Sequence, residues 1–156
     1  MAFPLTLTPV GDRNIRVERA FAAPPARLWR ALTEPALLLQ WQGMPSHPII
    51  EAEVDLRVGG RWRWAWRHPS GNLMVASGEY LLLDAPHRMI HTELFEEDWT
   101  DGPTTITTDL IPTEAGTRMV ADILYTGPRG RDMAMASGME HGMHICYDQL
   151  AALLAP

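Results

Sequence analysis

The C-terminal run from Arg129 to Leu154 constrains the fold most, because it is the longest proline-free segment with helical periodicity. Gly138 and Gly142 interrupt it, each at a cost of about 1 kcal/mol of helix propensity relative to alanine. Its apolar residues nevertheless recur every three or four positions, which places them on one face of an α-helix: Met135, Met139, Met143, Cys146, Leu150 and Leu153. We therefore predict one long amphipathic helix, approached closely at its glycines by a strand or a bound molecule.

Composition and charge narrow the class of protein. A chain of 156 residues, 46% of them hydrophobic, is long enough to bury a core within one globular domain. The net charge of −6 argues against nucleic acid or an anionic membrane as the main partner. A single cysteine, Cys146, excludes an internal disulfide, and no apolar stretch approaches the roughly 20 residues of a membrane span. With no signal peptide recognisable at the N-terminus, we expect a cytoplasmic protein.

The remainder of the chain shows mainly the two-residue period of β-strands. Residues 1–12 are predicted to form an irregular arm, and residues 13–156 a single α+β domain. Two short helices, 26–32 and 35–41, follow the first strand. The predicted strands are joined by short turns and therefore form an antiparallel sheet: 13–21, 49–56, 61–68, 73–83, 88–95, 104–111 and 117–125. Only the long helix is large enough to cover the apolar face of such a sheet.

Short motifs in a fixed order support this arrangement. They are Ala23-Pro24, Leu28 to Thr33, Pro35, Trp41, Asp55 to Trp62, Gly71, Gly78 to Tyr80, Asp84 to Met89, Gly116 to Met119 and Gly142 to Leu150. The ordered set spans about residues 13–154 and resembles the START and Bet v 1-like (SRPBCC) superfamily, specifically its activator of Hsp90 ATPase homologue 1-like family. The resemblance implies a helix-grip fold: a seven-stranded sheet around the C-terminal helix, with a hydrophobic cavity between them.

The family often has tryptophan where this chain has Met143, so we expect the cavity beside the helix to be opened or reshaped. The superfamily includes lipid and hormone binders, polyketide cyclases, hydrolases and chaperone partners. The resemblance alone therefore does not select a function.

Three tryptophans on one face of the strand 61–68 are the strongest local signal. They indicate either a cavity wall that binds an apolar or aromatic ligand, with indole N–H groups as donors, or ordinary core packing. A facing row of flexible methionines favours the cavity. The ligand-binding residues predicted from this arrangement are Trp41, Trp62, Trp64, Trp66, Met89, His91, Met135, Met139 and Met143.

His91 and Glu93 share a strand face with apolar neighbours, where they could orient a ligand or act as a base. The alternative is that this end of the strand reaches water. Glu140, His144 and Asp148 follow an i, i+4, i+8 spacing that could suit zinc, but they lie off the methionine face and form no H-E-x-x-H motif. We interpret them as a solvated helix face and predict no metal. No phosphate-binding loop or nucleophile motif is present in the sequence, so no cofactor is predicted.

Three functions are consistent with these observations. The first is binding of a small hydrophobic molecule between sheet and helix. The second is a cyclase or hydrolase that uses His91 or Glu93 as a base. The third is a protein-interaction module, such as a chaperone partner, which would display an exposed apolar patch. A homodimer is compatible with all three.

Overall fold

The computed structural model describes residues 4–156. In this part of the chain, eight strands form one antiparallel sheet in the order β1-β2-β8-β7-β6-β5-β4-β3. The elements are β1 (Thr6–Val10), β2 (Asn14–Phe21), α1 (Pro25–Thr33), α2 (Pro35–Trp41), β3 (Ile49–Val54), β4 (Arg61–Arg67), β5 (Leu73–Asp84), β6 (Arg88–Phe95), β7 (Thr104–Thr113), β8 (Gly116–Leu124), α3 (Pro128–Ala136) and α4 (Met139–Leu154). None of these helices is both long and apolar enough to cross a bilayer.

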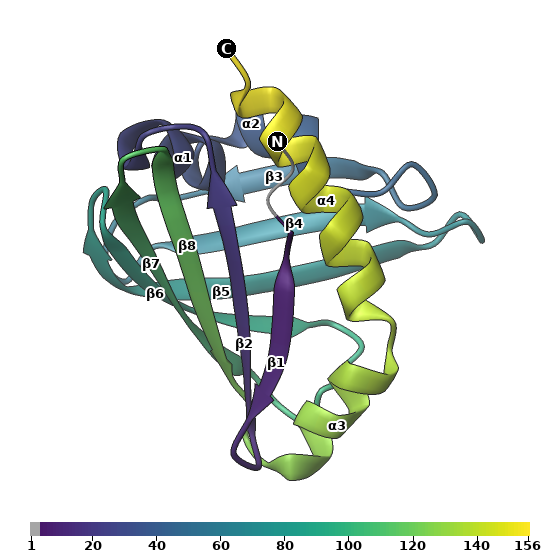
Figure 1. Ribbon diagram of the computed structural model, residues 1–156. Helices are drawn as coiled ribbons and strands as arrows, with labels where there is room; N and C mark the ends of the chain where they lie inside the picture. Colours follow the sequence, from purple (N-terminus) through teal and green to yellow (C-terminus); the bar gives the residue numbers. More distant parts are fainter. Residues whose placement is uncertain (1–3) are drawn as a thin grey trace.

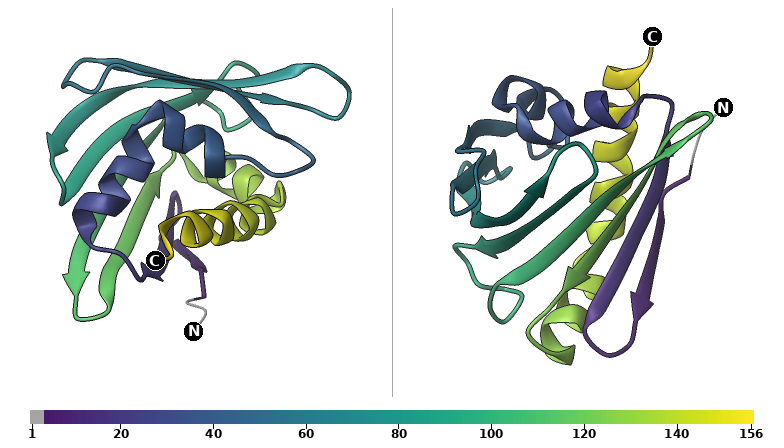
Figure 2. Two further views of the ribbon diagram at one scale, coloured as in Figure 1. Left: turned by 90° about the horizontal axis from the view of Figure 1, so that it is seen from above. Right: turned by 90° about the vertical axis from the view of Figure 1, so that its left-hand side faces the viewer.

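The sheet curves around α4, which runs along its concave side (Figures 1 and 2). The short helices α1 and α2 lie at the end of the sheet where α4 finishes. This arrangement confirms the predicted helix-grip α+β fold. All seven predicted strands and both predicted short helices are present, with ends shifted by a few residues.

The N-terminal arm differs from the prediction, because residues 6–10 form the eighth strand, β1. It pairs antiparallel with β2, with Leu7 opposite Val17. Two prolines in residues 1–12 suggested an irregular segment, but β1 lies at the edge of the sheet. An edge strand tolerates Pro9 because only one side of it must provide hydrogen bonds.

The predicted single C-terminal helix is also wrong: the structure divides it into α3 and α4. The chain turns at Gly138, whose φ of +82° lies in the left-handed region that glycine enters without steric cost. Ser137 ends α3, and its hydroxyl donates a hydrogen bond to the Ala134 carbonyl oxygen. The two helices therefore point in different directions, and the apolar face does not continue from one to the other.

The C-terminal half of α4 is held by the short helices. Leu150 and Leu154 are buried in one core cluster with Leu28 of α1 and Trp41 of α2. Arg27 of α1 donates a hydrogen bond of 2.7 Å to the Leu154 carbonyl oxygen, which places a cation at the negative end of the α4 dipole. These contacts fix the position of α4 relative to the sheet.

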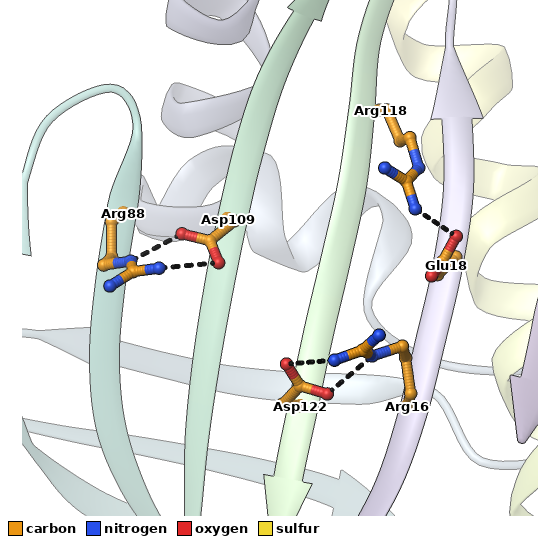
Figure 3. A network of polar contacts seen from close by, with 6 residues as sticks. All are labelled: Arg16, Glu18, Arg88, Asp109, Arg118 and Asp122. Atoms are coloured by element: carbon orange, nitrogen blue, oxygen red, sulfur yellow. Dashed lines mark hydrogen bonds and ion pairs between the residues drawn. The ribbon is translucent and has the colours of Figure 1, made fainter. Parts of the chain in front are cut away.

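The convex face of the sheet carries charges, in keeping with the alternation along each strand (Figure 3). Arg16 of β2 donates two hydrogen bonds to Asp122 of β8, at 2.9 and 3.4 Å, and these residues are direct cross-strand partners. The pairs Arg88–Asp109 and Arg118–Glu18 are formed on the same face. Exposed pairs of this kind contribute about 0–1 kcal/mol each, so their main effect is to keep this face polar.

Candidate functional site

The inward face of β4 carries Trp62, Trp64 and Trp66. Pairing with β5 places Gly78 opposite Trp62 and Ala76 opposite Trp64, and these small residues leave room for the indole rings. Neighbouring rings are in contact: the centroids of Trp62 and Trp64 are 4.6 Å apart, and those of Trp64 and Trp66 are 6.0 Å apart. The three rings form a continuous aromatic wall.

The three indole N–H groups are not equivalent. Trp62 donates to the Thr92 carbonyl oxygen at 3.1 Å, and Trp66 donates to the Gln42 carbonyl oxygen at 2.9 Å. The N–H of Trp64 is buried and has no partner within residues 4–156. An unpaired buried donor costs about 1–3 kcal/mol, which an acceptor group on a bound molecule would offset.

Strand β6 contributes Met89, His91, Glu93 and Phe95 to the same cavity. The His91 ring meets Trp62 edge to face, with centroids 5.7 Å apart. Its Nδ1 is buried without a partner in the described chain. Burial lowers the pKa of His91 to about 4, so the imidazole is neutral at physiological pH. The alternative was that this end of β6 merely reaches water; in the structure His91 and Glu93 are both partly buried and line the cavity.

Glu93 is the only acidic side chain of residues 4–156 in the cavity wall. Burial raises the pKa of its carboxyl to about 7. Thr104 of β7 is its direct cross-strand neighbour. Burial raises the pKa of Tyr125, which follows β8, and of Tyr147 in α4, and a negative charge on Glu93 raises both further. Both tyrosines line the same cavity as Glu93, within range of its charge.

The wall opposite the sheet comes from α4, through Met139, Met143, Cys146 and Tyr147. Gly142 lies among them at a point where the helix passes close to the loop after α2. A Cβ added at Gly142 would first meet the sulfur of Met44, at 3.6 Å, which is an ordinary van der Waals distance. Gly142 is therefore not required by a close contact at this point, and its missing side chain leaves open volume beside the helix.

The loop after α2 is tied to the helix. The side-chain amide of Gln149 donates to the carbonyl oxygens of Trp41, at 2.9 Å, and Gly43, at 2.6 Å. The Gln42 carbonyl oxygen meanwhile accepts the Trp66 N–H from the sheet. This loop therefore bridges α4 and β4 and sets the distance between the two walls.

The cavity has a volume of about 600 Å³ and is partly open to solvent. This value falls in the range of small-molecule sites, about 300–1,000 Å³. Aromatic rings continue from the tryptophan wall to one end of the cavity, where Phe95 lies 6.2 Å from Trp66 and 5.4 Å from Trp99 between centroids. The interior is thus large enough for a molecule of several rings.

The structure brings together eight of the nine predicted site residues: Trp41, Trp62, Trp64, Trp66, Met89, His91, Met139 and Met143. Their role in binding stays a prediction. Met135 was placed wrongly, because it belongs to α3, does not line the cavity and is 37% exposed. The turn at Gly138 ends the helical register on which its prediction depended.

Several cavity residues were not predicted, including Tyr80, Trp99, Tyr125 and Tyr147. Tyr147 could have been found, since it lies four residues after Met143 and therefore on nearly the same helix face. Tyr125 follows the inward alternation of β8. Trp99 lies in the loop between β6 and β7, where no periodic pattern marks the side that faces inward.

The acidic residues and histidines of α4 do not line this cavity. Glu140 and His144 approach each other at 3.9 Å, and Asp148 forms an ion pair of 2.7 Å with Arg19 of β2. The Arg19 guanidinium also lies over the Phe21 ring, 5.4 Å from its centroid. Within residues 4–156, no group of three histidine, cysteine or acidic side chains is arranged to hold a metal ion.

A curved antiparallel sheet around a C-terminal helix, with an aromatic cavity between them, defines a helix-grip protein. The family model for Activator of Hsp90 ATPase homolog 1-like protein matches residues 22–155, and the chain belongs to this family. Comparison with the curated proteins found no match.

Solved structures agree with this assignment. A crystal structure of a Rhodobacter sphaeroides protein is 34% identical, covers 97% of this chain and 98% of its own, and has a TM-score of 0.91. A Nitrosomonas europaea protein is 31% identical, with 94% and 97% covered and a TM-score of 0.81. A Mycobacterium smegmatis protein is 27% identical, with 97% and 98% covered and a TM-score of 0.86.

Proposed function

We propose that this protein binds a small, mainly apolar molecule containing an aromatic ring, held between β4 and α4. The observation that carries the proposal is the cavity of about 600 Å³, whose walls from sheet and helix are largely aromatic rings and methionines. Flat rings pack well against indole faces, and methionine side chains adapt to guests of different shape.

The unpartnered N–H of Trp64 adds a directional requirement. A guest with a carbonyl, ether or hydroxyl oxygen beside its ring would accept this hydrogen bond. A guest lacking an acceptor would leave a buried donor unpaired. The proposed ligand therefore combines an aromatic body with at least one acceptor atom.

The expected affinity is moderate. A guest of about 12 non-hydrogen atoms, contributing about 0.5 kcal/mol each, would gain 6 kcal/mol. This free energy corresponds to a dissociation constant of roughly 40 µM. Binding should quench or shift the fluorescence of the wall tryptophans and raise the melting temperature.

Two substitutions at one position test the proposal. Gly142→Leu would extend a side chain into the cavity, whereas the matched Gly142→Ala adds only a methyl group at ordinary contact distance. Both remove the same helix-breaking glycine. With a library of aromatic ethers, ketones and alcohols, wild type and Gly142→Ala should respond in fluorescence and melting temperature, and Gly142→Leu should not. No response from wild type across the library would overturn the proposal.

A second candidate is catalysis in the same cavity, as a cyclase or hydrolase. It is favoured by His91 and Glu93 lying together there, since a carboxyl with a pKa of about 7 can exchange a proton near neutral pH. Screening ester and lactone substrates against wild type, His91→Gln and Glu93→Gln would test it. Turnover that persists in both variants would refute this role while leaving binding intact. A cytoplasmic location, a homodimer and a protein partner stay predictions from the sequence.

A further inference from the structure

We infer that the cavity selects guests carrying a positively charged nitrogen and rejects guests carrying a carboxylate, with Glu93 as the counter-ion. This inference rests on the proposed function and specifies the charge of the ligand. It is based on three features of the interior, as far as residues 4–156 form it: a single acidic group, the absence of arginine from the lining, and the aromatic rings of that lining.

The first two features concern the distribution of charge. All 13 basic residues of the chain are arginines. None of the arginines in residues 4–156 lines the cavity, although His47 and His91 do. Burial is the only cause of the raised pKa of Glu93, so no hydrogen bond or nearby cation in the described chain stabilises its charged form. A guest carboxylate would therefore enter without a counter-ion and beside an acidic group.

The third feature is the set of aromatic rings that line the same cavity as the carboxyl. The faces of aromatic rings are negative, and a cation placed over them is attracted by about 0.5–2 kcal/mol in other proteins. Trp62, Trp64, Tyr80, Tyr125 and Tyr147 all line the cavity. An ammonium or amidinium nitrogen beside Glu93 would meet the carboxylate inside a cavity lined by these rings, while the apolar body of the guest packs against the methionines.

The groups that face Glu93 allow this assignment. His91, from the same strand, is neutral at physiological pH because burial lowers its pKa to about 4. Tyr125 and Tyr147 have raised pKa values and stay protonated, and burial also raises the pKa of the Cys146 thiol. The positive charge of Arg19, on β2, lowers the pKa of Tyr147, but the Arg19 guanidinium is paired with Asp148. No permanent positive charge of residues 4–156 therefore competes with a guest cation in the cavity.

Binding of a cation should also be linked to pH. With a pKa of about 7, Glu93 is mostly protonated at pH 6 and mostly ionised at pH 8. A guest amine that stays protonated over this range requires the ionised form, so its affinity should rise about tenfold from pH 6 to pH 8. At pH 6, binding should release a proton. A neutral guest of the same shape should show neither effect.

Three compounds with the same 6-methoxynaphthalene body, whose ether oxygen can accept from Trp64, provide the test: (6-methoxy-2-naphthyl)methylamine, (6-methoxy-2-naphthyl)methanol and (6-methoxy-2-naphthyl)acetic acid. Isothermal titration calorimetry at pH 8 should show the amine binding about tenfold tighter than the alcohol, with the acid weakest. Glu93→Gln should remove the preference for the amine, so that the amine and the alcohol bind with similar affinity. The control, Glu97→Gln, changes an exposed carboxylate outside the cavity and should bind like wild type.

The outcomes separate this inference from the proposed function. If the alcohol or the acid binds as tightly as the amine, charge selection is overturned and binding of aromatic guests stands. If the amine preference survives in Glu93→Gln, the counter-ion is not Glu93 and the inference fails. If none of the three compounds binds to wild type while ethers or ketones of the library do, charge selection is again refuted. If no aromatic compound binds at all, both proposals fail.

Discussion

Glu93 and His91 should make the free energy of unfolding depend on pH in opposite directions. The two effects largely cancel in wild type and should become visible when either residue is substituted. The folded pKa of Glu93, about 7, exceeds its usual 4.5, so its stabilising contribution is complete below pH 4.5 and is lost as pH rises through 7. The folded pKa of His91, about 4, lies below its usual 6.5, so its contribution is present above pH 6.5 and is lost as pH falls through 4.

The magnitudes follow from these values. Between pH 5 and pH 8, the Glu93 contribution to the free energy of unfolding should fall by about 2.5 kcal/mol. Over the same interval, the His91 contribution should rise by about 2 kcal/mol. The two effects nearly cancel in wild type. Relative to wild type, Glu93→Gln should therefore gain about 2.5 kcal/mol from pH 5 to pH 8, and His91→Gln should lose about 2 kcal/mol.

Urea unfolding followed by tryptophan fluorescence at pH 5, 6.5 and 8 measures these differences. Subtracting the wild-type free energy of unfolding at each pH removes the contribution of the other titrating groups. Glu97→Gln, an exposed substitution in the neighbouring loop, serves as the control and should track wild type. If the difference between Glu93→Gln and wild type does not change with pH, then Glu93 is not desolvated as described, and the electrostatic reasoning fails.

Two further predictions concern packing. Gly78→Ala should destabilise the protein by several kcal/mol or prevent folding, because its Cβ would lie 1.7 Å from the Thr92 carbonyl oxygen. Gly127→Ala, with nothing within 4 Å of the new Cβ, should change stability by less than about 0.5 kcal/mol in the same urea experiment. Leu150→Ala should cost about 2–5 kcal/mol, since this side chain is fully buried between α4 and the short helices. An unchanged urea midpoint for Leu150→Ala would mean that α4 does not pack as described.

Most of the sheet could be predicted from the sequence because strand periodicity is local. The alternation of Trp62, Trp64 and Trp66 with arginines marks which face of β4 points inward, whatever its neighbours do. The same alternation placed His91 and Glu93 beside Met89 on β6. Because the turns between these strands are too short for a parallel crossover, consecutive strands must pair antiparallel.

Other features depend on partners that local pattern does not specify. Residues 6–10 become β1 because β2 offers a free edge, which outweighs the irregular character suggested by Pro9. The helix turns at Gly138 because the chain must pass from the end of β8 onto the concave side of the sheet. Apolar residues recur with helical spacing on both sides of this glycine, so the sequence pattern does not reveal the turn. The prediction that Met135 lines the cavity is wrong for this reason.

The sequence by itself determined which residues face inward: the tryptophans of β4, the mixed face of β6 and the methionines of α4. Whether these faces touch or enclose a space was decided only by the tertiary structure. The distance between β4 and α4 is set by remote contacts, chiefly Gln149 and Trp66 bound to the loop after α2. Because no local pattern encodes that distance, the same residues could have formed a filled core, and here they surround a cavity.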